Sequence, residues 1–186
     1  NTNLEVSRLG MGGLFIATKN AEYEQARQAV HRAVGLGVTY ADTAPNYLDS
    51  EKVLGQIIQD IDTPLILSTK LGGRPQPFEP QNRSHLEQSV EESLRLLNRD
   101  HIDIFIIHEP DRPRQYDWWT DPEHFNGPAL DLLQDLKKDG TISAIGIGGT
   151  TAYEMADLIC TGKFDVVLTA FNYSLLWREA EHEVLP

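Results

Sequence analysis

The sequence predicts an α/β protein built on a parallel sheet, and three observations support this prediction. Short apolar runs alternate along the chain with longer stretches whose apolar residues recur at helical spacing. Most of the short runs are apolar throughout, as in parallel strands that are covered on both faces. Apolar residues make up 40% of the 186 and charged residues 24%, which is the balance of a folded globular protein.

Six strand-then-helix units follow one another, and no linker or change of composition divides them. The predicted strands cover residues 9–12, 38–41, 65–69, 102–107, 142–147 and 166–169. This order is typical of a parallel sheet with right-handed crossovers. We therefore expect residues 1–186 to form a single domain, either an open doubly wound sheet or a closed eightfold barrel.

The first two helices are indicated by an apolar face and by residues that favour helix ends. Ala26, Val30 and Ala33 recur on one face of the first helix, which Gly35 closes. Ser50 is placed to cap the second helix.

The later helices have clearer start and end signals. Residues 84–87 and 151–154 have the spacing of a capping box, in which a hydroxyl and a Glu carboxylate satisfy free backbone amides. Pro128 suits the first turn of the helix between them, and Gly140 suits its left-handed end.

The acidic composition excludes two classes of partner. Sixteen basic against 28 acidic side chains give a formal net charge of −12, which repels nucleic acid phosphates and anionic membrane surfaces. There is no run of about 18 apolar residues to cross a bilayer. The single Cys160 cannot form an internal disulfide. We expect a cytoplasmic protein that binds neither nucleic acid nor membranes.

Ionisable side chains end three consecutive predicted strands. Asp42 follows the second strand, Lys70 the third and His108 the fourth, and Tyr47 lies in the loop after Asp42. In a parallel barrel these strand ends share one face, where the active sites of that fold lie. Alone, each residue has an ordinary alternative: a cap, a solvated cation, a satisfied imidazole or a packed ring.

Together the four residue types suit proton transfer. A neighbouring ammonium lowers the pKa of a phenol from its usual value of about 10, and a carboxylate keeps that ammonium charged. We therefore predict that Lys70 and Asp42 tune Tyr47, which exchanges a proton with a carbonyl–alcohol pair. His108 would orient the carbonyl oxygen.

Four stretches resemble signature motifs of the aldo-keto reductases, in that family's order. They are residues 42–47 (Asp-Thr-Ala-Pro-Asn-Tyr), 50–55, 68–70 and 102–108, and residues 89–97 and 136–146 add to the likeness. The resemblance implies a (β/α)8 TIM barrel, of which this chain carries about the first six βα units. It also implies an NADP or NAD cofactor and hydride transfer to or from a small-molecule carbonyl or sugar, with the four catalytic roles just given.

The resemblance further implies where the cofactor binds. The residues assigned to it are Gly12, Gly13, Asp42, Gly148, Gly149 and Asn172. Gly148 and Gly149 stand where many members carry Ser-Asn, so contacts there would come from the backbone. Gly12 and Gly13 complete only half of a dinucleotide fingerprint, so they indicate either room near a ligand or a plain tight turn. Asn172 is a candidate amide ligand or a turn residue.

The last residues of the chain lead to expectations about the substrate and about how much of the barrel is present. Residues 164–176 resemble the branch that contains L-galactose dehydrogenase, D-threo-aldose dehydrogenase and pyridoxal dehydrogenase, which favours sugar or aldehyde oxidation. Units seven and eight of the barrel, which bind the adenosine end of the cofactor in the family, do not follow. We expect the natural protein to be longer and this chain alone to bind the cofactor weakly.

The loop after His108 is long and aperiodic. It contains Trp118 and Trp119, and loops of more than about 12 residues often form lids. We predict that Trp118 or Trp119 walls the substrate cleft, with packing against a neighbouring helix as the alternative.

Two other functions stay open at this point. Lys70 could form a Schiff base in a barrel lyase, although pairing with Asp42 would make it a poor nucleophile. The chain could also be a non-catalytic NADP-binding regulatory subunit, similar to the potassium channel β subunits. The histidines show no metal-ligand spacing, so no metal is expected. The sequence does not specify the oligomeric state, the preferred nucleotide or the direction of reaction.

Overall fold

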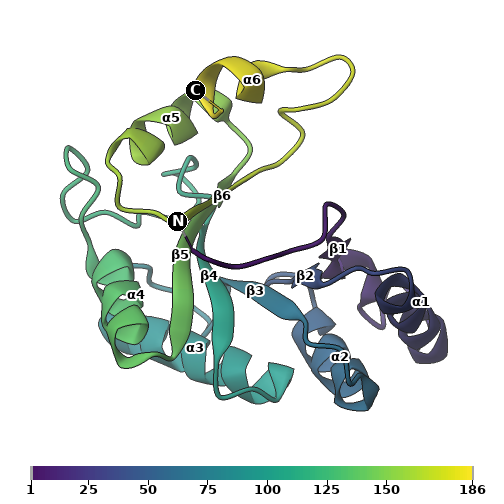
Figure 1. The fold of residues 1–186 in the computed structure, drawn as a ribbon. Helices are drawn as coiled ribbons and strands as arrows, with labels where there is room; N and C mark the ends of the chain where they lie inside the picture. The colour runs from purple at the N-terminus through teal and green to yellow at the C-terminus, as the bar shows by residue number, and fades with distance from the viewer. Residues whose placement is uncertain (1, 186) are drawn as a thin grey trace.

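The structure is a computed structural model that describes residues 2–185. Its centre is a six-stranded sheet in the order β1-β2-β3-β4-β5-β6, with every pairing parallel (Figure 1). The strands are β1 (Met11–Gly12), β2 (Tyr40–Asp42), β3 (Ile66–Leu71), β4 (Ile102–His108), β5 (Ile142–Gly149) and β6 (Val166–Thr169). Each strand pairs with the next in the chain, which excludes the doubly wound alternative because its strand order reverses. The sheet is therefore a half-barrel, as the first six units of a (β/α)8 barrel require.

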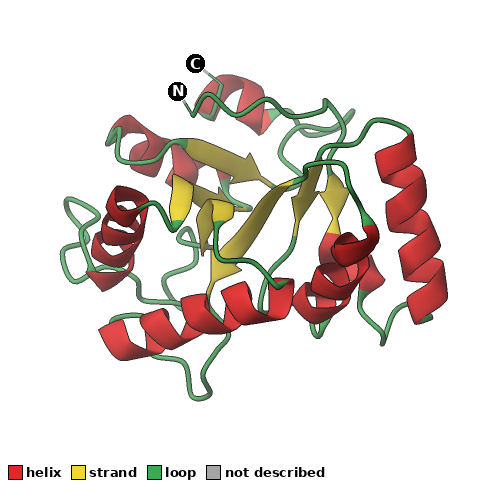
Figure 2. Ribbon diagram, turned by 60° about the horizontal axis from the view of Figure 1, so that its bottom comes forward, coloured by secondary structure: helices red, strands yellow, loops and turns green. Residues whose placement is uncertain are grey.

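Helices surround the strands in Figure 2. They are α1 (Tyr23–Gly35), α2 (Ser50–Ile57), α3 (Arg83–Leu97), α4 (Pro128–Asp139), α5 (Ala152–Cys160) and α6 (Glu179–Glu183), with 3-10 turns η1 (Gly13–Ile16) and η2 (Ile58–Asp60). None of the helices formed by residues 2–185 has the length and apolar character needed to cross a membrane.

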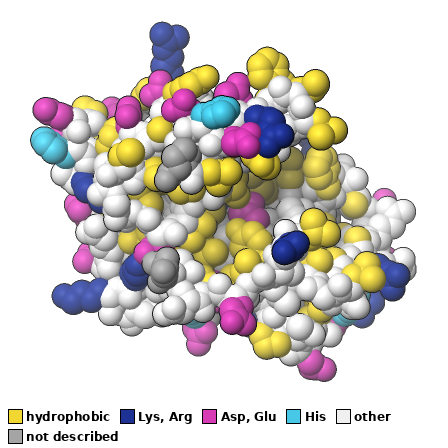
Figure 3. All heavy atoms as spheres, turned by 45° about the horizontal axis from the view of Figure 1, so that its top comes forward, with side chains coloured by type: hydrophobic (Ala, Val, Ile, Leu, Met, Phe, Trp, Pro, Cys, Tyr) yellow, Lys and Arg dark blue, Asp and Glu magenta, His cyan; other side chains and the backbone are white. Residues whose placement is uncertain are grey.

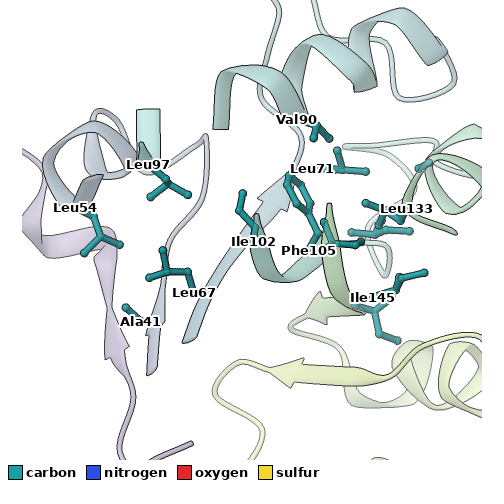
Figure 4. Packing of buried hydrophobic residues seen from close by; sticks show 14 of the residues in the cluster. Ala41, Leu54, Leu67, Leu71, Val90, Leu97, Ile102, Phe105, Leu133 and Ile145 are labelled. Carbon is teal, nitrogen blue, oxygen red and sulfur yellow. The ribbon is translucent and has the colours of Figure 1, made fainter. Parts of the chain in front are cut away.

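Alternation along the strands divides the apolar side chains between two clusters. Phe105 of β4 and Leu71 of β3 belong to the large outer cluster and point toward Val90 of α3 (Figure 4). Ile104 and Ile106 of β4 belong to a smaller cluster on the inner face of the sheet. Side chains two residues apart on a strand share a face, so this division follows directly from the strand geometry.

The strand ends differ from the predicted ones in a way that affects the site. β1 is shorter than predicted and β2 begins at Tyr40, whereas β3, β4 and β5 each run farther than predicted. Lys70, His108 and Gly148 are consequently strand residues rather than the first residues of loops. Their backbones are held by the sheet, which fixes the direction of the first two side chains.

Three predicted helix caps are wrong. The start of α3 is capped by the side chain of Asn82, which accepts from the amides of Ser84 and His85, and not by Ser84. Ser50 is the first residue of α2, and its hydroxyl donates to the carbonyl oxygen of Gly13 at 2.6 Å. Within the described chain Thr151 makes no side-chain cap for α5.

The capping signals of α4 are confirmed. Pro128 occupies the first turn of this helix, and Gly140 ends it with a φ of 86° in the left-handed region. The start of α5 is instead served by Asp111, from the loop after β4, which accepts from the amides of Thr150 and Thr151 at 2.8 and 2.7 Å.

Candidate active site

A cleft of about 320 Å³ lies at the carboxyl ends of the central strands. Tyr47, Lys70 and His108 line it together with Gly148 and Gly149. Figure 3 shows one face of the molecule with a hollow in which hydrophobic side chains gather. The sheet order explains the convergence, because parallel strands bring the side chains at their carboxyl ends to one edge.

Lys70 is the most deeply buried of the predicted catalytic residues, and only 1% of its side chain is exposed. Its ammonium donates to Oδ2 of Asp42 and to the carbonyl oxygen of Thr43, both at 2.7 Å. Burial lowers the pKa of Lys70, while Asp42 and then Glu51 raise it. The expected contact between Asp42 and Lys70 is therefore present in the structure.

Tyr47 lies between Lys70 and His108. The ammonium of Lys70 is 4.7 Å from the centre of the Tyr47 ring, and the ring of His108 meets Tyr47 edge-on with its centre 6.1 Å away. The phenol, amine, acid and imidazole thus meet in one place, although they come from three separate segments of the chain.

The pKa of Tyr47 is raised in this arrangement, whereas the residue types alone led to the expectation that Lys70 would lower it. Burial, followed by the charges of Asp42 and Glu109, raises the pKa of Tyr47 to about 12. The ammonium faces the ring as a cation–π contact, and both of its oxygen partners, Asp42 and Thr43, belong to other residues. Tyr47 is therefore a phenol that holds its proton at neutral pH.

His108 is a neutral imidazole. Burial and then the positive charges of Lys70 and Arg112 lower its pKa to about 3, with Asp111 opposing them. Its Nδ1 is buried and has no hydrogen-bond partner among residues 2–185. A neutral ring keeps one N–H to donate and one nitrogen to accept, which suits it to a carbonyl or hydroxyl group.

The glycines assigned to the cofactor lie in three different environments. Gly148 and Gly149 line the cleft. Gly12 is exposed on β1, and a Cβ there would meet nothing within 4 Å. Gly13 is buried, and a Cβ there would lie 2.7 Å from Oγ of Ser50, so close packing accounts for this glycine.

Asn172 joins two strand ends. Its amide nitrogen donates to the carbonyl oxygen of Thr150 at 2.9 Å and to the hydroxyl of Thr169 at 2.8 Å. Both of its N–H donors thus have partners within the protein, so its carbonyl oxygen is the atom left for any ligand.

The two tryptophans pack into the core, which is the alternative to the predicted wall of the cleft. Trp118 is fully buried, and its indole N–H donates to the carbonyl oxygen of His108 at 3.0 Å. Trp119 is 8% exposed and packs edge-on against Phe125. Neither residue lines the cleft as the structure describes it, because both rings are part of the outer core. They anchor the loop instead of closing over a substrate.

Sequence reasoning missed four polar residues of the cleft, Asn46, Glu109, Gln115 and Thr150. Glu109 directly follows His108 and pairs with Arg112 at 3.0 Å. Its position next to a strand-end histidine is the signal that could have identified it. Among residues 2–185 no group of His, Cys, Asp or Glu is arranged to hold a metal ion.

Comparison with known proteins identifies the family of this chain. The family model described as "Aldo/keto reductase family" matches residues 8–186 of this chain. The chain is 28% identical to Aldo-keto reductase YhdN of Bacillus subtilis, over 100% of this chain and 56% of that protein. It is also 28% identical to D-threo-aldose 1-dehydrogenase of a Pseudomonas species, over 95% of this chain and 58% of that protein.

The fold of the chain matches solved structures equally well. An aldo-keto reductase structure from Pseudomonas aeruginosa superimposes with a TM-score of 0.80 and 27% identity, over 98% of this chain and 68% of that one. The chain spans 56% and 58% of the length of the two curated relatives named above. Because the family description covers nearly the whole chain, this protein belongs to the aldo/keto reductase family.

Proposed function

We propose that the protein interconverts a carbonyl compound and an alcohol by hydride transfer, with Tyr47 as the general acid and base. The observation that carries this proposal is the meeting of Tyr47, Lys70 and His108 in one cleft, with Asp42 bonded to Lys70 at 2.7 Å. A phenol and a neutral imidazole side by side can serve a single substrate oxygen. The relative named D-threo-aldose 1-dehydrogenase supports an aldose or another small aldehyde as the substrate.

Tyr47 would supply the proton during reduction. With a pKa of about 12 the phenol stays protonated at neutral pH. An alkoxide is more basic than a phenolate, so a proton passes readily from Tyr47 to an oxygen that gains negative charge. In the reverse direction only about one phenol in 100,000 is ionised at pH 7, so oxidation would be limited by the supply of phenolate.

His108 and Lys70 would act on the same oxygen in different ways. The N–H of a neutral His108 would hold the carbonyl oxygen beside Tyr47. The ammonium of Lys70 lies beneath the ring of Tyr47, where its positive charge stabilises any negative charge on the phenol. Asp42 holds that ammonium in place.

The residues around the cleft fit a nicotinamide cofactor, NADP or NAD, which would supply or accept the hydride. Gly148 and Gly149 present backbone to the cleft, although a Cβ at Gly149 would lie 2.5 Å from Oδ1 of Asp111, so close packing accounts for that glycine. The unpartnered Nδ1 of His108 is a buried polar atom that a polar ligand group could satisfy. In this proposal Gly148, Gly149 and the carbonyl oxygen of Asn172 contact the nicotinamide end, and Gly12 lies at the open edge.

The test compares two phenol-to-phenyl changes. Carbonyl reduction is followed by the loss of nicotinamide absorbance, with NADPH or NADH and a panel of aldoses and simple aldehydes. Tyr47→Phe should lower kcat by about 1,000-fold, within the range for losing a general acid. Tyr153→Phe, at a position 60% exposed on α5, should leave the rates unchanged. Equal activity in all three proteins would contradict the proposal.

The same preparations separate the two alternative functions. Borohydride with substrate would label a Schiff-base lyase at Lys70, but the ion pair with Asp42 keeps that amine a poor nucleophile. A regulatory subunit would bind NADPH, seen by fluorescence titration, without turning over any carbonyl compound.

A further inference from the structure

The neighbouring strands β2 and β3 each place two polar side chains on the same face of the sheet. Tyr40 and Asp42 are two residues apart on β2, and Ser68 and Lys70 are two residues apart on β3. Side chains with this spacing point to the same side of a sheet. In the β2–β3 pairing Asp42 lies opposite Ser68, so the four side chains are neighbours.

These side chains form one continuous hydrogen-bonded chain. The hydroxyl oxygens of Tyr40 and Ser68 are 2.8 Å apart. The hydroxyl of Ser68 donates to Oδ1 of Asp42 at 2.6 Å, and the ammonium of Lys70 donates to Oδ2 at 2.7 Å. Both carboxylate oxygens of Asp42 are therefore held, one by each neighbour on β3.

The chemistry of the groups fixes the direction of each proton. Ionised Asp42 can only accept, so the single hydroxyl proton of Ser68 is directed to it. Ser68 must then accept from Tyr40. Tyr40 can serve as this donor because burial, the first cause, raises its pKa, with Asp42 adding to the effect and the bond to Ser68 opposing it. A phenol that keeps its proton completes the chain.

The surroundings offer no replacement for this arrangement. Ser68 is fully buried. The inner face beside it is apolar, since the cluster there consists of Ile104, Ile106 and Ala144 with further aliphatic neighbours and the ring of Tyr40. If Ser68 lost its hydroxyl, Oδ1 of Asp42 would lose its donor, and the carboxylate would be free to turn away from Lys70.

We propose that Ser68 and Tyr40 are positioning residues whose hydrogen bonds orient Asp42 so that Oδ2 stays on Lys70 and the ammonium stays charged beneath Tyr47. The catalytic meaning of this inference rests on the proposed function, but the orientation of the pair can be measured without any substrate. The proposal thus gives a role to two hydroxyl groups whose residues are not among those that line the cleft.

The charges around Lys70 determine in which direction its pKa should shift when Asp42 loses its bond to Ser68. Among the described residues, the titratable groups that face Lys70 are Asp42 from β2, Glu51 from α2, His108 from β4 and Tyr47 from the loop after β2, and Tyr40 faces Asp42. Burial lowers the pKa of Lys70 and Asp42 is the first group that opposes this. A weaker bond to Asp42 leaves burial less opposed, so the pKa of Lys70 should fall further.

The experiment follows the protonation of Lys70 by carbon-13 NMR of its ε-carbon, assigned through Lys70→Met. In Ser68→Ala this titration should move to lower pH, and Ser68→Thr, which retains the hydroxyl, should restore it. Tyr40→Phe should move it in the same direction by less. Ser89→Ala is the matched control, because Ser89 is fully buried and its hydroxyl has no partner among residues 2–185.

Kinetics of the same variants add a second measurement. Ser68→Ala should lower kcat roughly tenfold with an unchanged KM, as expected for one lost hydrogen bond to a charged group, and should move the alkaline limb of the pH profile downward. A Lys70 titration in Ser68→Ala that matches the wild-type protein would overturn the inference. Wild-type protein that reduces no carbonyl, with the NMR shift present, would reject the proposed function and support the orienting role.

Discussion

Two helical glycines are expected to respond in opposite ways to the same Gly→Ala change. A Cβ at Gly55 in α2 would lie 2.1 Å from the carbonyl oxygen of Leu96 and 2.8 Å from Cα of Leu97, both in α3. A Cβ at Gly35, the last residue of α1, would meet nothing within 4 Å. Gly55 therefore lets two helices touch through their backbones, whereas Gly35 has no such task.

The magnitudes follow from these contacts. Alanine is favoured over glycine in a helix by up to about 1 kcal/mol, so Gly35→Ala should stabilise the fold by about 0.5 kcal/mol at this terminal position. At Gly55 the neighbouring atoms are backbone and cannot rotate away, so α2 and α3 must separate by roughly 1 Å to reach ordinary contact. Overpacking of this kind costs about 3 kcal/mol, which leaves Gly55→Ala destabilised by about 2 kcal/mol after the helix gain.

Urea unfolding followed by far-ultraviolet circular dichroism measures both variants against the wild-type protein. In thermal unfolding, the midpoint temperature of Gly55→Ala should also fall by roughly 4 to 8 °C, at about 2 to 4 °C per kcal/mol for a chain of this size. Equal free energies of unfolding for Gly55→Ala and Gly35→Ala would refute the reasoning, because helix propensity alone would then account for both.

Three further predictions concern the site. Because the pKa of Tyr47 is about 12, alcohol oxidation should rise about tenfold per pH unit between roughly pH 7 and 10 while carbonyl reduction stays flat, and equal profiles in the two directions would contradict this. His108 has a pKa lowered to about 3, so the folded state binds fewer protons than the unfolded state below about pH 6.5; stability should fall from there toward pH 3, and His108→Gln should reduce that slope in urea titrations at several pH values. Trp118→Phe should cost about 2 kcal/mol of stability through the lost hydrogen bond and volume, and should leave KM unchanged; a raised KM with normal stability would restore the lid hypothesis.

The positions of the candidate catalytic residues could be predicted from the sequence because each depends on local pattern and simple topology. Asp42, Lys70 and His108 each end an apolar run, and parallel strands bring such ends to one edge. The same alternation, followed two residues back from Asp42 and Lys70, leads to Tyr40 and Ser68. That step was available from the sequence once the strands were placed.

The loop and the helix caps depend on partners far away in the chain. Trp118 is buried because Phe78 and Tyr116 pack against it, and nothing in the aperiodic loop indicates which of its aromatic rings turns inward. Thr151 has the sequence of a cap, but Asp111, 40 residues earlier, accepts from its amide. Local propensity is a weak guide wherever a tertiary contact supplies the same hydrogen bond.

The sign of the pKa shift at Tyr47 shows why residue types alone did not predict the electrostatics of the site. A lysine beside a tyrosine is expected to favour phenolate, but Lys70 forms a 2.7 Å bond with Asp42, whose own negative charge opposes that effect at Tyr47. Burial, followed by the charges of Asp42 and Glu109, favours the protonated phenol. The positive charge of Lys70 can stabilise negative charge that develops on the phenol oxygen, because the ammonium already lies over the ring. A site built in this way keeps the phenol of Tyr47 protonated at neutral pH, which suits the proposed carbonyl reduction better than alcohol oxidation.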